Sequence, residues 1–207
     1  MGPAPPTEAG RAGPTEAGTR ERLVESSVEL FRRRGYAGTG LKAILAASHA
    51  PFGSLYHFFP GGKEELGVAA LHAGGATYRE LVEAIFAEGI DVATATANFF
   101  EGAALVVETT GYADACPIAT VALEVASTNE PMRIAAAEVF ESWLVVLRAR
   151  FTEAGIPASR AHELAVELFC AIEGAFLLSR TTRSVEPINI AGRAAVATVQ
   201  AALAQVS

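Results

Sequence analysis

Side chains suited to a buried face recur every three or four positions over most of this chain, which is the spacing of amphipathic helices. The first such segment begins at Thr19, a residue type that caps helices, and ends before Gly35, a common terminator. Its last turn holds the basic residues 32–34, which suit the negative end of a helix dipole. The residues at helical spacing are Leu23, Val24, Ser27, Val28, Leu30 and Phe31. We therefore predict a helix over residues 19–34.

Two short helices and the start of a long one are predicted next. Thr39 is placed to N-cap the first short helix, which residues 49–51 end. The second covers about 51–58, because proline suits a first helical turn, and residues 60–62 end it. The long helix begins at Lys63, with two acidic residues close behind it near the positive end of the helix.

Beyond residue 66 the helical pattern continues almost without interruption. Breaks fall near residues 89–91, 111–117, 129–131, 155–157 and 186–187, between segments rich in Ala, Leu, Val and Glu. Few segments show the alternation of β-branched residues that is typical of strands. The predicted fold class is all-α, with about nine helices.

The chain is predicted to divide into three parts. Residues 1–18 contain the pentapeptide PTEAG twice and have little to bury, so we expect a disordered tail. Residues 19–65 form a three-helix head, in which two short helices joined by a tight turn have the layout of a helix-turn-helix. Residues 66–207 form a larger helical domain, whose expected roles are given below.

The head carries a specific signature. Residues 39–66, TGLKAILAASHAPFGSLYHFFPGGKEEL, resemble the DNA-binding motif of TetR-type transcriptional regulators, through Gly-x-Leu-Tyr-x-x-Phe followed by Lys-x-x-Leu. The variant APxGSLYHxFPGGK and the segments CPIATVALEVA and IEGAFLLSR are similar to the LmrA/YxaF-like branch. The clear match covers about residues 19–72. The resemblance implies a regulator, expected to be a repressor, that binds a double-stranded DNA operator.

The resemblance implies a DNA-binding role for eight positions. Tyr56 and Lys63 match positions that contact phosphate in the family, and Ser54 and His57 have hydrogen-bonding groups for base edges. Gly53 allows close approach of the backbone to DNA. The full set is Thr39, Lys42, Phe52, Gly53, Ser54, Tyr56, His57 and Lys63.

Two residues depart from the family pattern, and several have alternative interpretations. His49 stands where the family usually has a glycine with positive φ, and Phe52 stands where a basic or polar residue is usual. Phe52 either contacts apolar groups on DNA or packs against its own head. Tyr56 and His57 could be ordinary exposed residues, and residues 32–34 could be a solvated helix end or a DNA contact.

Composition first argues against nucleic acid, because the chain is 51% hydrophobic, 19% charged and has a net charge of −7. The charge is unevenly distributed, however. Residues 19–65 hold seven basic and five acidic residues, a net charge of +2, whereas residues 66–207 hold eight basic and sixteen acidic residues, a net charge of −8. The tail contributes −1. The head is therefore mildly basic, and the acidity belongs to the larger domain.

Other classes of protein and site are disfavoured. The two cysteines, Cys116 and Cys170, lack metal-ligand spacing, so we expect no zinc site, no other metal and no cofactor. Cys116 precedes a helix, where a redox-sensitive thiolate is conceivable, and Cys170 is predicted to be a core residue. The chain has no apolar run of about 18 residues and no apolar leader, so no membrane partner and a cytoplasmic location are expected.

The larger domain is predicted to hold a pocket for a small, largely hydrophobic effector. Any one of its aromatic residues could instead be plain core. The candidate walls are Phe99, Phe100, Ala103, Val107, Val121, Trp143, Leu147, Phe169 and Phe176. The candidate polar contacts are Asn98, Glu101, Glu108, Glu124 and Glu173.

The resemblance also implies a homodimer through the last two helices, predicted at about residues 158–184 and 188–205. Their apolar surfaces rich in small residues suit a four-helix interface, although a buried intramolecular core would use the same pattern.

The alternative function is a helical small-molecule binding protein that does not bind an operator. An enzyme is not predicted, because the sequence shows no nucleophile–base pair, no spaced carboxylate pair and no phosphate loop.

Overall fold

The computed structural model describes residues 16–114 and 116–205. All regular secondary structure in these ranges is helical, which confirms the predicted all-α class with about nine helices. The helices of the described ranges are α1 (Glu16–Arg34), α2 (Leu41–Ser48), α3 (Phe52–Phe58), α4 (Lys63–Ile85), α5 (Val92–Thr109), α6 (Pro117–Val125), α7 (Glu130–Glu153), α8 (Ala158–Thr182) and α9 (Glu186–Ala204). No described helix is both long and apolar enough to cross a membrane.

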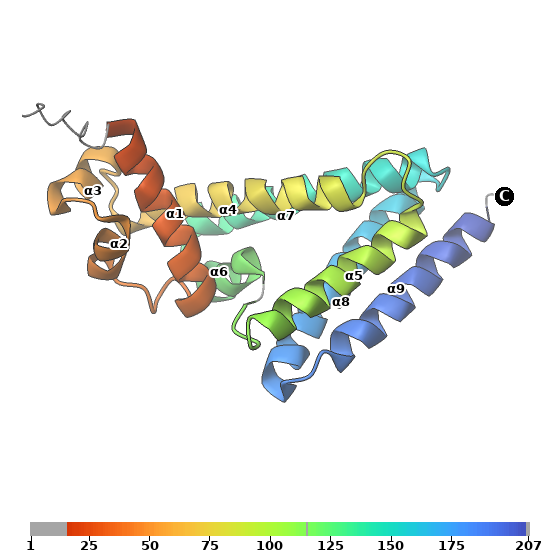
Figure 1. The fold of residues 1–207 in the computed structure, drawn as a ribbon. Helices are drawn as coiled ribbons and strands as arrows, with labels where there is room; N and C mark the ends of the chain where they lie inside the picture. Colours follow the sequence, from red (N-terminus) through yellow and green to blue (C-terminus); the bar gives the residue numbers. More distant parts are fainter. Residues whose placement is uncertain (1–15, 115, 206–207) are drawn as a thin grey trace, which may run out of the picture.

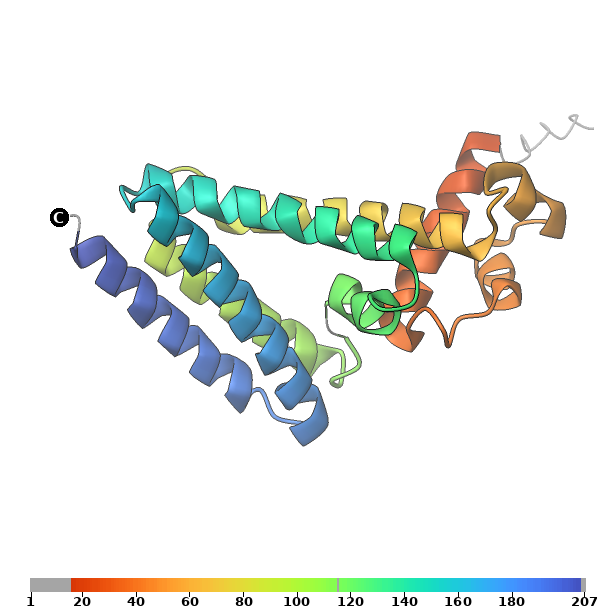
Figure 2. The same ribbon diagram turned by 180° about the vertical axis from the view of Figure 1, so that it is seen from behind.

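Helices α1, α2 and α3 form a head at one end of the long helices α4 and α7, which run side by side (Figure 1). Helix α6 packs between α1 and α7. Helices α5, α8 and α9 lie on the other side of the molecule, and α9 ends far from the head (Figure 2). The head is therefore presented at the tip of an elongated helical body.

The start of the head differs from the prediction at two places. Helix α1 begins at Glu16, so residues 16–18, predicted as tail, belong to a helix, while residues 1–15 lie outside the described residues. The prediction that Thr39 N-caps α2 is wrong. Gly40 occupies the N-cap, and the buried Thr39 hydroxyl instead donates to the Gly35 carbonyl at 2.8 Å. Thr39 therefore ties the α1–α2 loop to the end of α1.

The turn between α2 and α3 has the backbone conformation that the sequence predicts. His49 caps α2 with φ 51 and ψ 34, in the left-handed region. This conformation costs a residue with a Cβ about 1–2 kcal/mol, whereas glycine adopts it freely. The head therefore stores a small backbone strain at this exposed turn.

Two clusters of buried side chains organise the molecule. The head cluster joins α1–α4 to α6 and the first half of α7, through residues that include Leu23, Ile44, Leu66, Val121 and Trp143. The far cluster joins the ends of α4 and α7 to α5, α8 and α9, through residues that include Phe86, Phe100, Phe151, Leu168 and Val199. Phe169 and Phe176 pack against both clusters.

The predicted domain boundary after residue 65 does not coincide with a gap in the structure. It falls inside α4, which continues from Lys63 to Ile85. The head also shares its core with α6 and α7, so a shift in those helices is transmitted to the head through packed side chains.

Candidate functional site

The outer face of α3 is open to solvent. Phe52 is 64% exposed and Tyr56 49% exposed, and their ring centroids lie 6.1 Å apart. His57 is also exposed, while Leu55 alone in this helix is fully buried and anchors it to the head. Phe52 therefore does not pack into its own head, which removes one of its two interpretations.

Gly53 lies on the same helix, and no neighbouring atom of the chain excludes a larger side chain at this position. A Cβ atom at this position would meet nothing within 4 Å, and its φ is not in the left-handed region. A helical glycine costs about 1 kcal/mol relative to alanine, so neither internal packing nor backbone geometry accounts for it. The missing side chain leaves room for something outside the chain to approach the backbone.

The remaining candidates for DNA contact are not equally available. Lys42 is exposed on α2 and Ser54 is half-buried on α3. Thr39 is buried with its hydroxyl bonded to backbone, so its side chain has no access to a phosphate. Lys63 donates to the Tyr36 carbonyl at 2.7 Å and lies 4.1 Å from the Tyr36 ring centroid, and burial lowers its pKa. Lys63 therefore fastens the α1–α2 loop to α4.

The three arginines at the end of α1 have different environments. Arg33 pairs with Glu29 at 2.5 Å on the surface, and Arg34 is exposed. Arg32 instead forms ion pairs with Glu29 and with the buried Asp114, which precedes α6. Neither of the two predicted interpretations fits Arg32, because it links the head to the larger domain.

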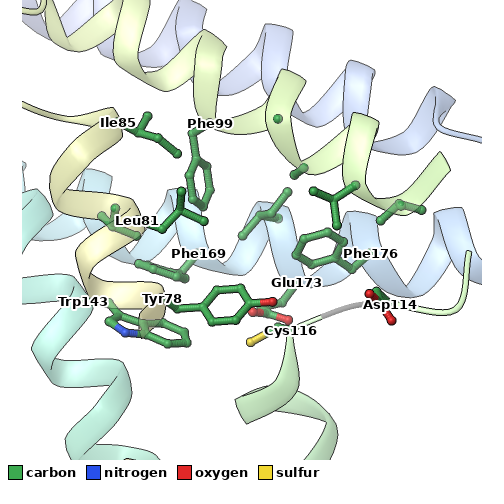
Figure 3. Close-up of a pocket in the computed structure, with 16 residues that line it drawn as sticks. Tyr78, Leu81, Ile85, Phe99, Asp114, Cys116, Trp143, Phe169, Glu173 and Phe176 are labelled. Atoms are coloured by element: carbon green, nitrogen blue, oxygen red, sulfur yellow. The ribbon is translucent and has the colours of Figure 1, made fainter. Parts of the chain in front are cut away.

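A cavity of about 230 Å³ lies within the larger domain, between α4, α5, α7 and α8 (Figure 3). Its walls are mostly apolar, with aromatic rings from four helices. Trp143 and Phe169 stack with centroids 5.6 Å apart, and Phe99 meets Phe169 at 6.3 Å. The aromatic lining residues are Tyr78, Phe99, Trp143, Phe169 and Phe176.

Polar groups gather on the side of the cavity away from Ile85 and Phe99, as Figure 3 shows for Tyr78, Cys116 and Glu173. Burial raises the pKa of the Glu173 carboxyl by more than the neighbouring Cys116 thiol lowers it. Burial and the charge of Glu173 raise the pKa of the Cys116 thiol well above its usual range. The thiolate that the sequence made conceivable for Cys116 is therefore disfavoured.

The fourth polar group, Asp114, connects the cavity to the head. It lines the cavity and pairs with Arg32 of α1. Burial raises the pKa of Tyr78. No sequence pattern indicates this arrangement, because Arg32 and Asp114 are 82 residues apart. It is the main functional feature that sequence reasoning missed.

The structure brings together some of the predicted ligand-binding residues and separates others. Phe99, Ala103, Val107, Trp143, Phe169, Glu173 and Phe176 line the cavity. Phe100, Val121 and Leu147 are buried in the two hydrophobic clusters and do not line it. The polar candidates Asn98, Glu101, Glu108 and Glu124 are exposed outside it. A period of 3.6 residues identifies the buried face of a helix but not which buried residues meet a cavity.

One cavity residue stands out in the sequence. Gly102 interrupts the apolar helix α5, and a Cβ there would meet nothing within 4 Å. Some other helical glycines have close neighbours, such as Gly75, whose Cβ would lie 2.4 Å from a methyl of Val139. Gly53 and Gly174, however, are as open as Gly102 and do not line the cavity. A helical glycine therefore points to a special position without showing that it faces a cavity.

The outward faces of α8 and α9 carry apolar residues without partners in the described chain. They include Val166, Leu177, Leu178 and Ile190, which are 37–65% exposed. Cys170 is also exposed on α8, so its prediction as a core residue is wrong for the single chain. Val166, Cys170 and Leu177 recur at helical spacing on one stripe. No group of three or more His, Cys, Asp or Glu residues in the described chain is arranged to hold a metal ion.

Comparisons with known proteins agree with this arrangement. Residues 23–70 match the family model of bacterial regulatory proteins of the tetR family, and residues 92–194 match the C-terminal domain of LmrA/YxaF-like transcriptional regulators. The HTH-type transcriptional regulator YxaF of Bacillus subtilis is 34% identical over 82% of this chain and 89% of its own length. LmrA of the same species is 32% identical over 82% of this chain and 90% of its own length.

Solved structures show the same fold. Regulatory protein TetR from Rhodobacter sphaeroides has a TM-score of 0.77 at 23% identity, over 87% of this chain and 98% of that one. The reduced form of NemR from Escherichia coli has a TM-score of 0.75 at 24% identity, over 86% of this chain and 94% of that one. The relatives in these comparisons are transcriptional regulators, not enzymes.

Proposed function

This chain belongs to the TetR family of transcriptional regulators, in the branch of LmrA and YxaF, and we propose that it is a homodimeric repressor released from its operator by a small, largely hydrophobic effector. The exposed face of α3 is the observation that carries the DNA-binding part of this proposal. A helix that enters the major groove needs an outer face free of intramolecular partners. Phe52, Tyr56 and His57 form such a face, and Gly53 leaves space between them.

The contacts between the two ends of the molecule support effector control. Asp114 lines the cavity and pairs with Arg32 in α1, and Glu124 of α6 accepts a hydrogen bond from the Ala37 backbone N–H at 2.6 Å. An effector that displaces Asp114 or α6 therefore moves the end of α1 and, with it, the recognition helix. By linkage, DNA and the effector then weaken each other's binding by the same factor.

The apolar stripe on α8 supports a dimer. Paired heads are needed to reach two half-sites about 34–36 Å apart, one turn of DNA. The stripe of Val166, Cys170 and Leu177, together with Ile190 of α9, offers a surface that a second copy would cover. A two-fold interface of α8 and α9 from each subunit would bury this surface against itself.

The dimer is tested with Leu177→Glu, because a buried charge in the interface favours dissociation. We expect the wild type to sediment as a dimer and this variant as a monomer, with faster maleimide labelling of Cys170. Leu123→Glu is the matched control, because Leu123 is an 85% exposed leucine on α6. A monomeric wild type, or equal effects of the two variants, contradicts the dimer.

Operator binding is tested by gel shift and fluorescence polarisation with the DNA upstream of the chain's own gene. We expect Tyr56→Ala and Lys42→Ala to weaken binding to all sequences, and Lys42→Ala to lower the salt dependence by about one counterion. His57→Ala should change sequence preference. Arg79→Ala removes an exposed positive charge from the middle of α4 and is the matched control for Lys42→Ala. Absence of binding at low salt would instead favour a small-molecule binding protein without an operator.

A further inference from the structure

The cavity described above has an electrostatic asymmetry that bears on what it binds. Of the residues that line it, as far as the structure describes them, none is Lys, Arg or His, while two are carboxylic acids, Asp114 and Glu173. The charge of Asp114 is compensated by Arg32, which approaches from α1. Glu173 forms no ion pair with a basic side chain of the described residues, and its polar neighbour is the Cys116 thiol. The cavity thus holds one carboxyl group without a cation.

An unpaired carboxylate in an apolar cavity is costly, because the charge loses its hydration and gains no partner. The cost is visible in the raised pKa of Glu173. A bound anion would increase this cost, since it would face both Glu173 and Asp114. A bound cation would remove it, because it supplies the missing opposite charge in an environment of low dielectric constant.

The aromatic walls favour the same kind of ligand. The faces of Trp and Tyr rings attract cations, with Trp the stronger of the two. Trp143 and Tyr78 both line the cavity with ring centroids 6.1 Å apart, and Tyr78 is the ring drawn beside Glu173 in Figure 3. The remaining walls, such as Phe99 and Phe169, suit an apolar body. The volume of about 230 Å³ restricts the ligand to a compact molecule.

We propose that this cavity binds a compact hydrophobic cation, an aromatic or alkyl ammonium compound, with its positive charge held between the Glu173 carboxylate and the rings of Trp143 and Tyr78. This inference rests on the proposed function, because it specifies the chemical class of the effector of the same cavity.

The test compares three small probes on the full chain. Benzyltrimethylammonium is the cation, neopentylbenzene is its neutral isostere, and 4-tert-butylbenzoate is an anion of similar bulk. Trp143 is the chain's one tryptophan and lines the cavity, so its fluorescence reports occupancy directly. We expect the cation to bind at least about tenfold more tightly than the isostere, and the anion to bind most weakly.

Substitution of the carboxyl identifies the group responsible. We expect Glu173→Gln to weaken binding of the cation by about tenfold and to leave binding of the isostere unchanged. Glu108→Gln is the matched control, because Glu108 is an exposed carboxylate on α5 outside the cavity, and it should alter neither affinity. Equal affinity for cation and isostere, tighter binding of the anion, no binding of the cation, or loss of cation binding in Glu108→Gln would each overturn the inference.

The pH dependence gives a second readout. Affinity for the cation should rise with pH as Glu173 ionises, over a range above that of an ordinary glutamate, and this rise should be absent in Glu173→Gln. The other titratable or charged groups around Glu173 are Cys116, Tyr78, Asp114 and its partner Arg32. The pKa values of Cys116 and Tyr78 are raised, so their titration lies on the alkaline side of this rise. A pH profile that is the same in both proteins would contradict the inference.

Failure of this inference can be distinguished from failure of the proposed function, because the fluorescence titration uses no DNA. Cation binding that depends on Glu173, in a protein that binds no operator, would uphold the ligand class and contradict the repressor. Operator binding in a protein that shows no preference for the cation would support the repressor and contradict the ligand class.

Discussion

The head cluster and the far cluster are both packed from helices, but they are connected in different ways. Directional polar contacts join the helices of the head cluster: Arg32 with Asp114, Glu124 with the Ala37 backbone, and Asn129 with Glu64 at 2.6 Å. The far cluster is a broad apolar core of α5, α8 and α9, and the polar contacts around it, among the described residues, run from arginines to loop carbonyls, such as Arg150 to the Ala87 carbonyl at 3.0 Å, without an ion pair to a buried carboxylate. Apolar packing tolerates small sliding, whereas a hydrogen-bonded ion pair fixes the relative position of two elements.

This difference predicts that the two clusters respond differently to a change in the cavity. The cavity lies where the two clusters meet, since Trp143 belongs to the head cluster and Phe169 packs against both. Under the proposed function, a ligand there would repack the apolar side and displace the polar side as a unit. The head would then move as one body and keep the geometry between α2 and α3.

The largest effect is expected at the junction of the clusters. Trp143→Ala removes a fully buried ring and leaves the Gly75 carbonyl without its 2.9 Å hydrogen bond from the indole, so we expect a loss of about 3–5 kcal/mol in the free energy of unfolding. Urea unfolding followed by circular dichroism measures it. Phe52→Ala removes an exposed ring and should change stability by less than about 0.5 kcal/mol. Similar losses in both variants would contradict the assignment of these two rings.

The ion pair between the head and the larger domain should give the next largest effect. Arg32→Met leaves the buried Asp114 without its cation, and we expect a loss of about 2–4 kcal/mol. Asp114→Leu on the Arg32→Met background should recover part of this loss, as measured in a double-mutant cycle. Arg33→Met, which breaks a surface pair, serves as the control and should cost less than about 1 kcal/mol. Additive effects would show that the pair does not couple the two parts.

The acidic group of the cavity should make stability depend on pH. Because burial raises the pKa of Glu173 in the folded chain, the folded state favours the protonated form, and stability falls as pH rises from the ordinary range of glutamate through this raised pKa. Glu173→Gln should therefore be more stable than the wild type at neutral pH and equal to it in acid. Thermal melts across this range measure the difference. A constant difference at all pH values would contradict the raised pKa.

The smallest effect concerns the head alone. His49→Gly relieves the left-handed conformation and should stabilise the chain by about 0.5–1 kcal/mol in urea unfolding, after allowance for the greater entropy of unfolded glycine. Ala46→Gly, at an exposed position within α2, should instead destabilise it by about 1 kcal/mol. Destabilisation by both changes would mean that His49 makes a contact that offsets its strain.

Local pattern was sufficient to predict the helices and much of the α3 face. The 3.6-residue period, the capping residues and the proline and glycine breaks define helices from neighbouring residues alone, whereas positive φ at His49 was expected from the glycine that the family usually has there. The packing shared by α1, α6 and α7 was not predicted, because it depends on contacts distant in sequence.

The cavity was harder to predict for the same reason. Phe99 and Phe100 are adjacent aromatic residues on one helix, yet Phe99 faces the cavity and Phe100 packs against Gly192 of α9. Their difference is set by which helix lies opposite each of them. Likewise, the role of Arg32 is decided by Asp114, a residue that no local pattern associates with it.

Gly102 has a consequence for how regulators of this kind diversify. Gly102 is an exposed residue at the edge of the cavity, and a Cβ there would meet no heavy atom of a neighbouring helix within 4 Å. Replacement by alanine or valine would therefore reduce the size of the accepted molecule while leaving the contacts between helices in place. Under the proposed function, a duplicated copy of the gene would acquire a different inducer through this one codon, with its operator and its partner subunit unchanged.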